Sequence, residues 1–345
     1  VLESCINIFN FFSCIYLIIK LKTTRLMHVN LKTMLISLSV TLIFFNSFRF
    51  IKSLGYFLLQ SDDVIESYQI FFYNRFCVVN RFFYDATVNV LSFTMLGLIL
   101  ERTAATCFVR VYEKTNSSFL ARTIVALQWI CGVFFALGFL VVDQLEEDYW
   151  NSPTVLVTCS FVYTKPGVVL TLFGSSVILF CTFTGLSIFL YYFNRRQFQE
   201  AMNRKLTIRY QYKENVTTLT FLVPMLTVFG ISNIISGLLI TYMFVHIVQQ
   251  GVNDRLVDNL WKIEKAYNAT VSVYTIFFVL ICTKLHNPLW ESFTKDLRWI
   301  CRCSDGAAAV QEKSSKIRLV GKNGKLIEGA NEGDVYFKTL RETWS

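Results

Sequence analysis

Two adjacent charged residues, Glu101 and Arg102, follow a nearly unbroken apolar run in the stretch LILERTAATCFVR, residues 98–110. A carboxylate beside a guanidinium can form a strong charge-assisted pair. Charged residues also commonly mark the point where a hydrophobic helix leaves the membrane and water begins. The two residues alone leave both interpretations open, a functional ion pair or a plain helix end.

Asp85 is the clearest ionisable residue inside an apolar run. Ionisable side chains within a membrane are costly and usually functional. Asn89 follows at i+4 and shares the helix face of Asp85, whereas Tyr84 is expected on a different face. Asp85 could bind a cationic group of a ligand, or it could pair with a cation of the protein itself, for which the candidates are Arg49, Lys52, Arg81 and Lys265.

Other polar residues in the later apolar runs could line the same ligand cavity as Asp85. In a membrane interior such residues also commonly hydrogen-bond to neighbouring helices instead. The candidates for a ligand contact are Asn233, Tyr242, Glu264 and Tyr267, together with Asn268, Ser175 and Ser176.

The elements that must position these residues are long apolar helices. The chain has 345 residues, of which 54% are hydrophobic and only 4 are Pro. Seven apolar blocks are each long enough to cross a hydrocarbon core of about 30 Å as a helix. They cover residues 2–19, 30–50, 75–101, 123–142, 167–192, 216–245 and 261–282. The pattern predicts an all-α membrane protein, a seven-transmembrane helix bundle, and excludes a β-barrel, whose strands would be short alternating segments.

Charge in the connecting loops predicts the orientation of the bundle. Lys and Arg concentrate in the first, third and fifth loops, whereas the fourth loop contains the acidic stretch DQLEEDYW. Because cytoplasmic loops carry the excess of Lys and Arg, the N-terminus is predicted outside and the C-terminus in the cytoplasm. Arg49 and Lys52, near the second loop, weaken this contrast. The net charge of +9 therefore reflects membrane topology, and no basic groove or motif indicates nucleic-acid binding.

An amphipathic helix is predicted over residues 289–301, after the last apolar block. Its apolar residues recur at helical spacing with Lys and Arg between them, which is typical of a helix on the inner membrane surface. Cys301 and Cys303 at its end could carry palmitate or could be reduced cytosolic thiols. The helical domain is thus predicted over residues 1–303, and residues 304–345 are predicted to form a flexible cytoplasmic tail.

Two cysteines fall on the predicted outer side, Cys77 at the start of the third block and Cys159 in the fourth loop. An oxidising exterior permits a disulfide between them, which would fix the longest outer loop to the third helix. Cys77 precedes Arg102 by 25 residues, which is about 37 Å of helix and one full crossing of the membrane. A cysteine and an acid–Arg pair therefore bracket one helix.

The combination of seven apolar blocks, a bracketed third helix and a loop cysteine resembles a seven-helix G-protein-coupled receptor. In such receptors an acidic residue and an Arg at the inner end of helix three restrain the resting state, and activation frees the Arg to meet the G protein. Glu101 and Arg102 match that pair, so the resemblance implies that they form a latch. Thr103 stands where many of these receptors have Tyr.

Three strings resemble a narrower family, LERTAATCFVRVYEK (residues 100–114), HVNLKTML (28–35) and TIRYQYKEN (207–215). They are similar to the nematode serpentine chemoreceptors, and class epsilon (Sre) is expected to fit best, with the related alpha, beta and alpha-beta classes sharing parts of the pattern. The resemblance implies an integral plasma-membrane receptor in the cilia of sensory neurons. It also implies a small-molecule ligand and a heterotrimeric G protein as partners.

The sequence shows no motif that is typical of catalysis, and its three His residues, at 28, 246 and 286, are widely separated. We therefore expect no enzyme activity, no metal site and no cofactor. Two other functions stay open. A transporter or channel is one, although neither the inverted repeats nor the broken helices typical of transporters are seen. A receptor-like partner protein that does not signal is the other, and the retained Glu101–Arg102 pair argues against it.

Overall fold

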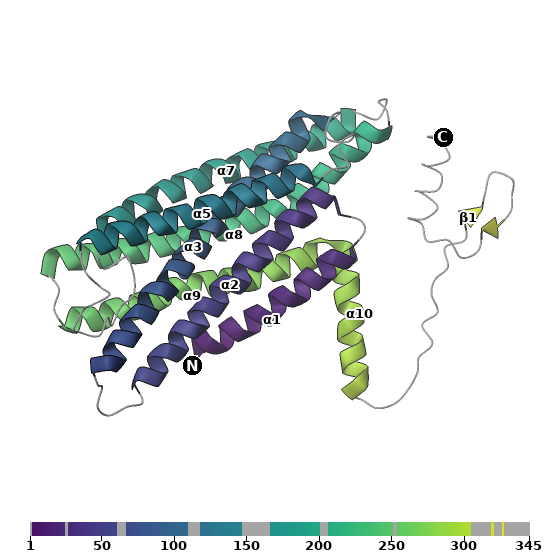
Figure 1. Cartoon of the computed structure of the whole chain (residues 1–345). Coiled ribbons are helices and arrows are strands. Elements are labelled where there is room, and N and C mark those ends of the chain that lie inside the picture. The colour runs from purple at the N-terminus through teal and green to yellow at the C-terminus, as the bar shows by residue number, and fades with distance from the viewer. Residues whose placement is uncertain are drawn as a thin grey trace. The chain divides into compact units, whose positions relative to one another are not determined.

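The computed structural model describes residues 2–24, 27–60, 67–109, 118–146, 166–200, 206–250, 254–304, 319–320 and 326–327. Contacts divide the chain into two compact units, residues 1–295 and residues 296–345. The first unit is a bundle of long helices that run alongside one another (Figure 1). Each unit is described by itself below.

Seven long helices build the first unit, and each contains a segment that is apolar and long enough to cross a membrane. They are α1 (Leu2–Thr23), α2 (Val29–Gln60), α3 (Ser67–Cys107), α5 (Phe119–Glu146), α7 (Pro166–Glu200), α8 (Leu206–Gln250) and α9 (Asp254–Leu285). The predicted all-α bundle of seven apolar helices is therefore confirmed within the described part of the chain.

Most helices extend well beyond the predicted apolar blocks. Helix α3 has 41 residues, which corresponds to about 60 Å of helix and is about twice the thickness of the hydrocarbon core. Apolar composition marks only the segment in lipid, whereas helical hydrogen bonding continues into polar sequence outside it. The predicted third block ends at residue 101, whereas α3 continues as a helix to Cys107.

The helices pack mainly on their neighbours in sequence, and α1 closes the bundle against α9. Helix α3 contacts α2, α5, α7 and α8 and is the central element. Helix α3 approaches α5 closely, since a Cβ added at Gly132 would lie 2.3 Å from Cγ2 of Val90 and 3.0 Å from the backbone nitrogen of Val90. Small residues at helix contacts allow such approach in membrane proteins.

The core of the bundle is built mainly by α1, α2, α3, α8 and α9. Met34, Leu38, Met95, Leu98 and Leu222 are fully buried there. Helices α5 and α7 are the least buried of the seven spans and expose large apolar side chains such as Phe134, Ile178 and Phe189. These faces are suited to lipid, where exposed apolar surface carries no penalty.

Helix α10 (Asn287–Ser304) follows α9, as predicted, and its first part belongs to the helical unit. Leu289 is buried, and the ring of Phe293 meets the ring of Tyr16 edge to face at 6.1 Å between centroids. The side chains of Cys301 and Cys303 lie outside the described residues, so their lipidation stays a prediction. In the predicted tail, β1 (Leu319–Val320) and β2 (Leu326–Ile327) pair antiparallel, and the rest lies outside the described part.

Candidate functional site

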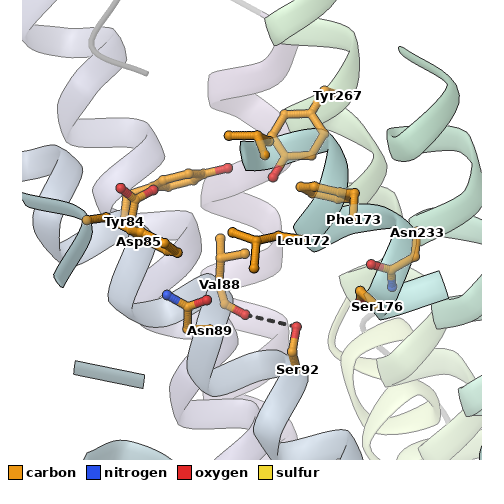
Figure 2. Close-up of a pocket in the computed structure, with 12 residues that line it drawn as sticks. Tyr84, Asp85, Val88, Asn89, Ser92, Leu172, Phe173, Ser176, Asn233 and Tyr267 are labelled. Carbon is orange, nitrogen blue, oxygen red and sulfur yellow. Dashed lines mark hydrogen bonds between the residues drawn. The ribbon is translucent and has the colours of Figure 1, made fainter. Parts of the chain in front are cut away.

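A cavity of about 150 Å³ lies between five helices of the bundle (Figure 2). Helix α3 contributes four of its seven polar lining residues, α7, α8 and α9 contribute one each, and α5 contributes only an apolar residue. Its polar lining consists of Tyr84, Asp85, Asn89, Ser92, Ser176, Asn233 and Tyr267. Its apolar lining consists of Val88, Phe139, Val169, Leu172 and Phe173.

The polar residues of α3 form a stripe along the cavity. Asp85, Asn89 and Ser92 follow each other at spacings of four and three residues, which places them on one helix face. The carboxylate of Asp85 pairs with Arg81 one turn earlier, with Oδ2 3.5 Å from Nε. Of the two interpretations open for Asp85, pairing with a cation of the protein is therefore present in the structure, and the partner is Arg81.

Opposite this stripe, α7, α8 and α9 provide aromatic and amide groups. The rings of Phe173 and Tyr267 meet edge to face with centroids 5.7 Å apart. Asn233 donates its amide to the carbonyl oxygen of Phe229 at 2.9 Å within its own helix. The cavity is therefore amphipathic, with hydrogen-bonding groups and apolar rings facing the same space.

Five of the nine candidate ligand residues line this cavity, Asp85, Asn89, Ser176, Asn233 and Tyr267. Tyr242 does not, because its side chain is 54% exposed and its ring packs on His246. The prediction failed there because polarity shows that a residue is unusual in lipid without showing which way it faces. Glu264 lies in the neighbouring ion cluster. Ser175 is exposed, and Asn268 hydrogen-bonds to Tyr84.

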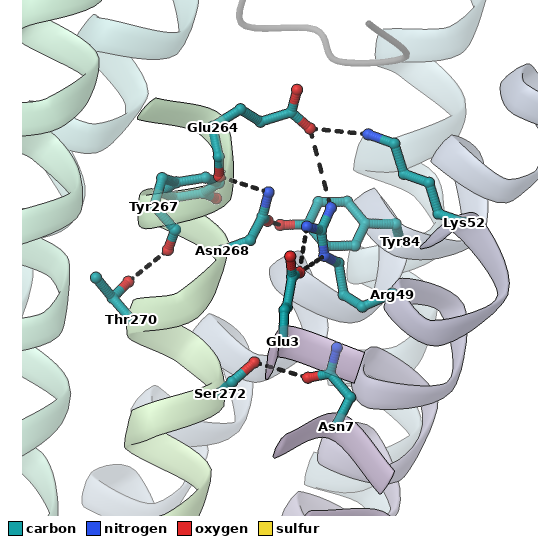
Figure 3. Close-up of polar contacts among 10 residues, drawn as sticks. All are labelled: Glu3, Asn7, Arg49, Lys52, Tyr84, Glu264, Tyr267, Asn268, Thr270 and Ser272. Carbon is teal, nitrogen blue, oxygen red and sulfur yellow. Dashed lines mark hydrogen bonds and ion pairs between the residues drawn. The ribbon is translucent and has the colours of Figure 1, made fainter. Parts of the chain in front are cut away.

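Tyr84 lines the cavity beside Asp85, although the two were expected on different faces. Successive residues are about 100° apart around a helix, and a cavity as wide as this one can contact both. The Tyr84 hydroxyl donates a hydrogen bond to Oδ1 of Asn268 on α9 (Figure 3). Tyr84 thus connects the cavity to the polar residues of α9.

An ion cluster joins α1, α2 and α9 next to the cavity (Figure 3). Arg49 donates from Nε and Nη2 to Oε1 of Glu3, at 3.1 and 2.5 Å. Lys52 donates to Oε1 of Glu264 at 2.8 Å, and Nη1 of Arg49 lies 3.9 Å from the same oxygen. We call Glu3, Arg49, Lys52 and Glu264 the Glu264 cluster.

The Glu264 cluster changes how two loop charges are interpreted. Arg49 and Lys52 weakened the charge contrast between the predicted loops, yet both belong to α2, which continues to Gln60. The side chain of Arg49 is only 6% exposed and faces the bundle. These two cations therefore pair with the partly buried Glu3 and the buried Glu264, and they are not part of a loop.

A second charged centre lies near the other end of α3, where Glu101 and Arg102 are 0% and 1% exposed. Nε and Nη2 of Arg102 donate to the two carboxylate oxygens of Glu101, each at 2.5 Å. Nη1 of Arg102 reaches Oδ1 of Asn215 at 3.3 Å and Oγ1 of Thr218 at 3.4 Å, both on α8. Such burial contradicts the interpretation of the pair as a plain helix end at water.

Amide and hydroxyl groups extend this centre to α7. The Asn215 amide donates to Oδ1 of Asn194 at 3.3 Å, and the Asn194 amide donates to Oγ1 of Thr106 at 3.0 Å. Helices α3, α7 and α8 are thereby joined through one buried hydrogen-bonded set. We call Glu101, Arg102, Thr106, Asn194, Asn215 and Thr218 the Arg102 core.

The turn between α1 and α2 packs against the Arg102 core. Glu214 accepts a hydrogen bond from the backbone of His28, and Nδ1 of His28 accepts one from the backbone N–H of Asn30 at 3.3 Å. Burial lowers the pKa of His28, the charge of Arg102 lowers it further, and Glu101 opposes both effects. His28 is therefore held neutral, as an acceptor at the start of α2.

Asn194 and Asn215 were not predicted as functional residues. A signal was present, since Gln211, Asn215 and Thr218 recur at spacings of four and three and are all buried on one face of α8. The three sequence strings quoted above also meet at this place. His28 belongs to the first, Glu101 and Arg102 to the second, and Asn215 to the third.

Comparison of the sequence with known proteins identifies the family of the chain. Residues 1–298 match the profile of a family described as "Serpentine type 7TM GPCR receptor class ab chemoreceptor". The chain belongs to this family. The receptor is therefore an integral membrane protein of a chemoreceptor family, and that family is one of receptors and not of enzymes.

Two curated relatives from Caenorhabditis elegans agree with this assignment. "Serpentine receptor class alpha/beta-14" is 26% identical over 295 residues, which are 83% of this chain and 72% of the relative. "Probable G-protein coupled receptor F27E5.8" is 21% identical over 238 residues, 66% of this chain and 63% of the relative. The expected class epsilon is not supported, since the family match and the first relative point to class alpha/beta, one of the related classes that the strings left open.

Of the two cysteines in the predicted disulfide, only Cys77 is among the described residues. Cys77 is disulfide-bonded, whereas Cys159, its predicted partner, lies outside the described residues. Among the described cysteines, Cys5, Cys107 and Cys181 are free and exposed, and Cys14 and Cys282 are free and buried.

Proposed function

We propose that this receptor binds an external small molecule in the cavity and activates a heterotrimeric G protein through the Arg102 core. One observation carries the proposal. Three helices each contribute to both the cavity and the Arg102 core, and on each of them a cavity residue and a core residue lie 17 or 18 positions apart. The pairs are Asp85 and Arg102 on α3, Ser176 and Asn194 on α7, and Asn233 and Asn215 on α8.

This arrangement gives a direct mechanical connection between the two places. A separation of 17 or 18 residues is about 26 Å along a helix, so each of the three helices spans most of the membrane between its two contacts. A ligand that touches all three helices biases their relative positions. The Arg102 core is where a change in those positions breaks specific hydrogen bonds.

The resting state is the one in which Arg102 is held. Its guanidinium is paired with Glu101 and joined to α8 through Asn215 and Thr218. Hydrogen bonds to charged groups contribute about 1.5–3 kcal/mol each, so losing the contacts to α8 is a change of a size that a small ligand can offset. Ligand binding then shifts the population toward a packing in which α8 has moved and Arg102 is available to the G protein.

We assign the cavity to the outside and the Arg102 core to the cytoplasm. Arg195 and Arg196 are exposed at the end of α7 that carries Asn194, which suits the cytoplasmic face. The disulfide-bonded Cys77 lies in the N-terminal part of α3, at the opposite end of that helix from Arg102. This position suits an oxidising exterior. The N-terminus is then outside, the C-terminus is inside, and the family suggests the cilia of sensory neurons as the location.

The test uses basal activity and needs no ligand. Asn215→Ala removes the amide that joins Arg102 to α7 and α8, so basal nucleotide exchange on co-expressed Gα subunits should rise severalfold. Thr217→Ala is the matched control. Thr217 is exposed on the same helix, and among the described residues its hydroxyl bonds only to the carbonyl oxygen of Lys213, one turn earlier. Both substitutions remove the same Asn-Val-Thr glycosylation sequon.

Arg102→Ala should abolish exchange at equal surface expression, and adding it to Asn215→Ala should remove the gain. No gain in Asn215→Ala, or a gain that survives the loss of Arg102, would sink the proposal. Those results would favour a transporter or a non-signalling partner protein.

A further inference from the structure

We propose that the cavity takes an uncharged ligand of about six to nine non-hydrogen atoms, with a hydroxyl or carbonyl group on a compact apolar body. The inference rests on the proposed function, because it names the chemical class of the molecule that the receptor detects. It is argued from the volume, the charge and the hydrogen-bonding groups of the cavity.

The volume restricts the size of the ligand. Pockets for drug-sized molecules are about 300–1,000 Å³, whereas this cavity measures about 150 Å³. An engineered protein cavity of about 150 Å³ accommodates benzene. A peptide, a nucleotide or a long-chain lipid does not fit in the space that the structure shows.

The charge of the cavity argues against an ionic ligand. Among the described residues that line it, Asp85 is the one with a formal charge, and its carboxylate already faces the guanidinium of Arg81 at 3.5 Å. A cationic ligand would have to displace Arg81, whose side chain is only 10% exposed. A carboxylate ligand would meet Asp85 as a like charge.

Neutral groups, by contrast, retain unused hydrogen-bonding capacity. No described residue hydrogen-bonds to the side chain of Asn89 or of Ser176, and Asn233 uses its amide nitrogen but not Oδ1. These three residues come from α3, α7 and α8 and face the same space (Figure 2). Together they offer donors and acceptors that suit a hydroxyl or carbonyl oxygen.

The remaining surface suits a compact apolar body. Phe139, Val169, Leu172 and Phe173 form the wall from α5 and α7. An uncharged ligand with one polar group would place that group against the α3 stripe and its apolar part against this wall. It would then contact α3 and α7, and a hydrogen bond to Asn233 would add α8, the third helix that carries the Arg102 core.

The experiment measures binding to the purified receptor in lipid nanodiscs by saturation-transfer NMR. The probes are cyclohexanol, cyclohexylammonium and cyclohexanecarboxylate, which share one apolar body and have about seven to nine non-hydrogen atoms. Ser176→Phe fills the cavity, so the signal that remains in this variant measures the probe that partitions into the lipid. Ser175→Phe is its matched control, because Ser175 is the adjacent residue and is exposed on α7. Ser92→Leu is a second filled-cavity variant, in which the larger side chain enters the cavity from α3.

Cyclohexanol should bind the wild type and Ser175→Phe, and its binding should fall at least tenfold in Ser176→Phe and Ser92→Leu. Asn89→Leu should weaken it at least fivefold. Both charged probes should bind the wild type at least tenfold more weakly than cyclohexanol. Arg81→Gln should strengthen cyclohexylammonium binding at least tenfold, because it leaves the Asp85 carboxylate without that guanidinium.

Tighter binding of either charged probe to the wild type would overturn the proposal, and so would cyclohexanol binding that neither filled-cavity variant weakens. Because this measurement includes no G protein, it is independent of the basal exchange assay. The receptor could therefore fail to signal while the ligand class holds, or signal while the ligand class is wrong.

Discussion

The two polar centres along α3 differ in how completely their groups are satisfied. In the Arg102 core, a fully buried carboxylate and guanidinium are paired and three helices are joined by amides and hydroxyls. In the cavity, Asp85 is 20% exposed and Asn89 and Ser176 have no hydrogen-bond partner among the described residues. A dry, satisfied centre specifies one arrangement, whereas unused polar groups around a void suit a site that receives a molecule.

The sharpest test of this difference is Glu101→Gln. It leaves Arg102 buried without its counter-charge, and breaking a buried pair in this way costs about 3–5 kcal/mol. The free energy of unfolding in detergent micelles should fall accordingly. Glu200→Gln is the matched control, since it breaks a pair with Arg196 in which the side chains are 79% and 44% exposed, and such pairs contribute about 0–1 kcal/mol. Equal effects would show that the Arg102 core is not dry.

Glu264→Gln applies the same change next to the cavity and should cost less. Lys52 and Arg49 lose the shared carboxylate, but Arg49 keeps its two hydrogen bonds to Glu3. We expect a loss of about 1.5–3 kcal/mol, the range for hydrogen bonds to charged groups. A loss as large as that of Glu101→Gln would show that the Glu264 cluster contributes as much to stability as the Arg102 core, which would contradict the comparison.

A matched pair of Asn→Leu substitutions compares the two centres directly. Asn215→Leu breaks bonds to Arg102 and Asn194 and should lower stability by about 1–3 kcal/mol, because it leaves buried partners unsatisfied. Asn89→Leu breaks no hydrogen bond within the described structure and should change stability by less than about 0.5 kcal/mol. Thermal unfolding of both variants in nanodiscs measures the difference. Similar losses would contradict the contrast between the two centres.

The smallest expected effect is a pH dependence through His28. Its pKa is lowered in the folded receptor by burial and by Arg102, so the unfolded chain binds a proton first as the pH falls. The contribution of neutral His28 to the free energy of unfolding is therefore fully present above the unfolded pKa of about 6.5. That contribution is lost as the pH falls below this value. Burial lowers the pKa of His286 as well, so a dependence of the same sign remains in His28→Gln. Unfolding of the wild type and of this variant between pH 8 and pH 5 should differ in slope, and identical slopes would refute a role for His28.

The sequence predicts the part of this fold that hydrophobicity determines. The seven spans follow from apolar length, yet the end of α3 does not, because a helix continues where its hydrophobic segment stops. Glu101 and Arg102 were recognised as a pair, but their burial depends on α8 covering them, which adjacency in sequence cannot show.

Contacts between distant residues explain the remaining misses. Asn194 and Asn215 are 21 residues apart and meet only because α7 and α8 pack side by side. Tyr242 is as polar as Tyr267, but it faces outward and Tyr267 faces the cavity. Rotation of a helix about its axis is set by packing, and a helix that is apolar on all faces gives little sign of it.

The central claim is that Asn215 holds α8 against α3, and a distance measurement tests it without a ligand or a G protein. Spin labels would be placed on Cys107, which is free and exposed at the end of α3, and on Lys213→Cys, at an exposed position of α8, with the other exposed cysteines replaced. The account predicts one short distance in the otherwise unchanged receptor and a second, longer population that grows in Asn215→Ala but not in Thr217→Ala. The same distance distribution in all three proteins would contradict it.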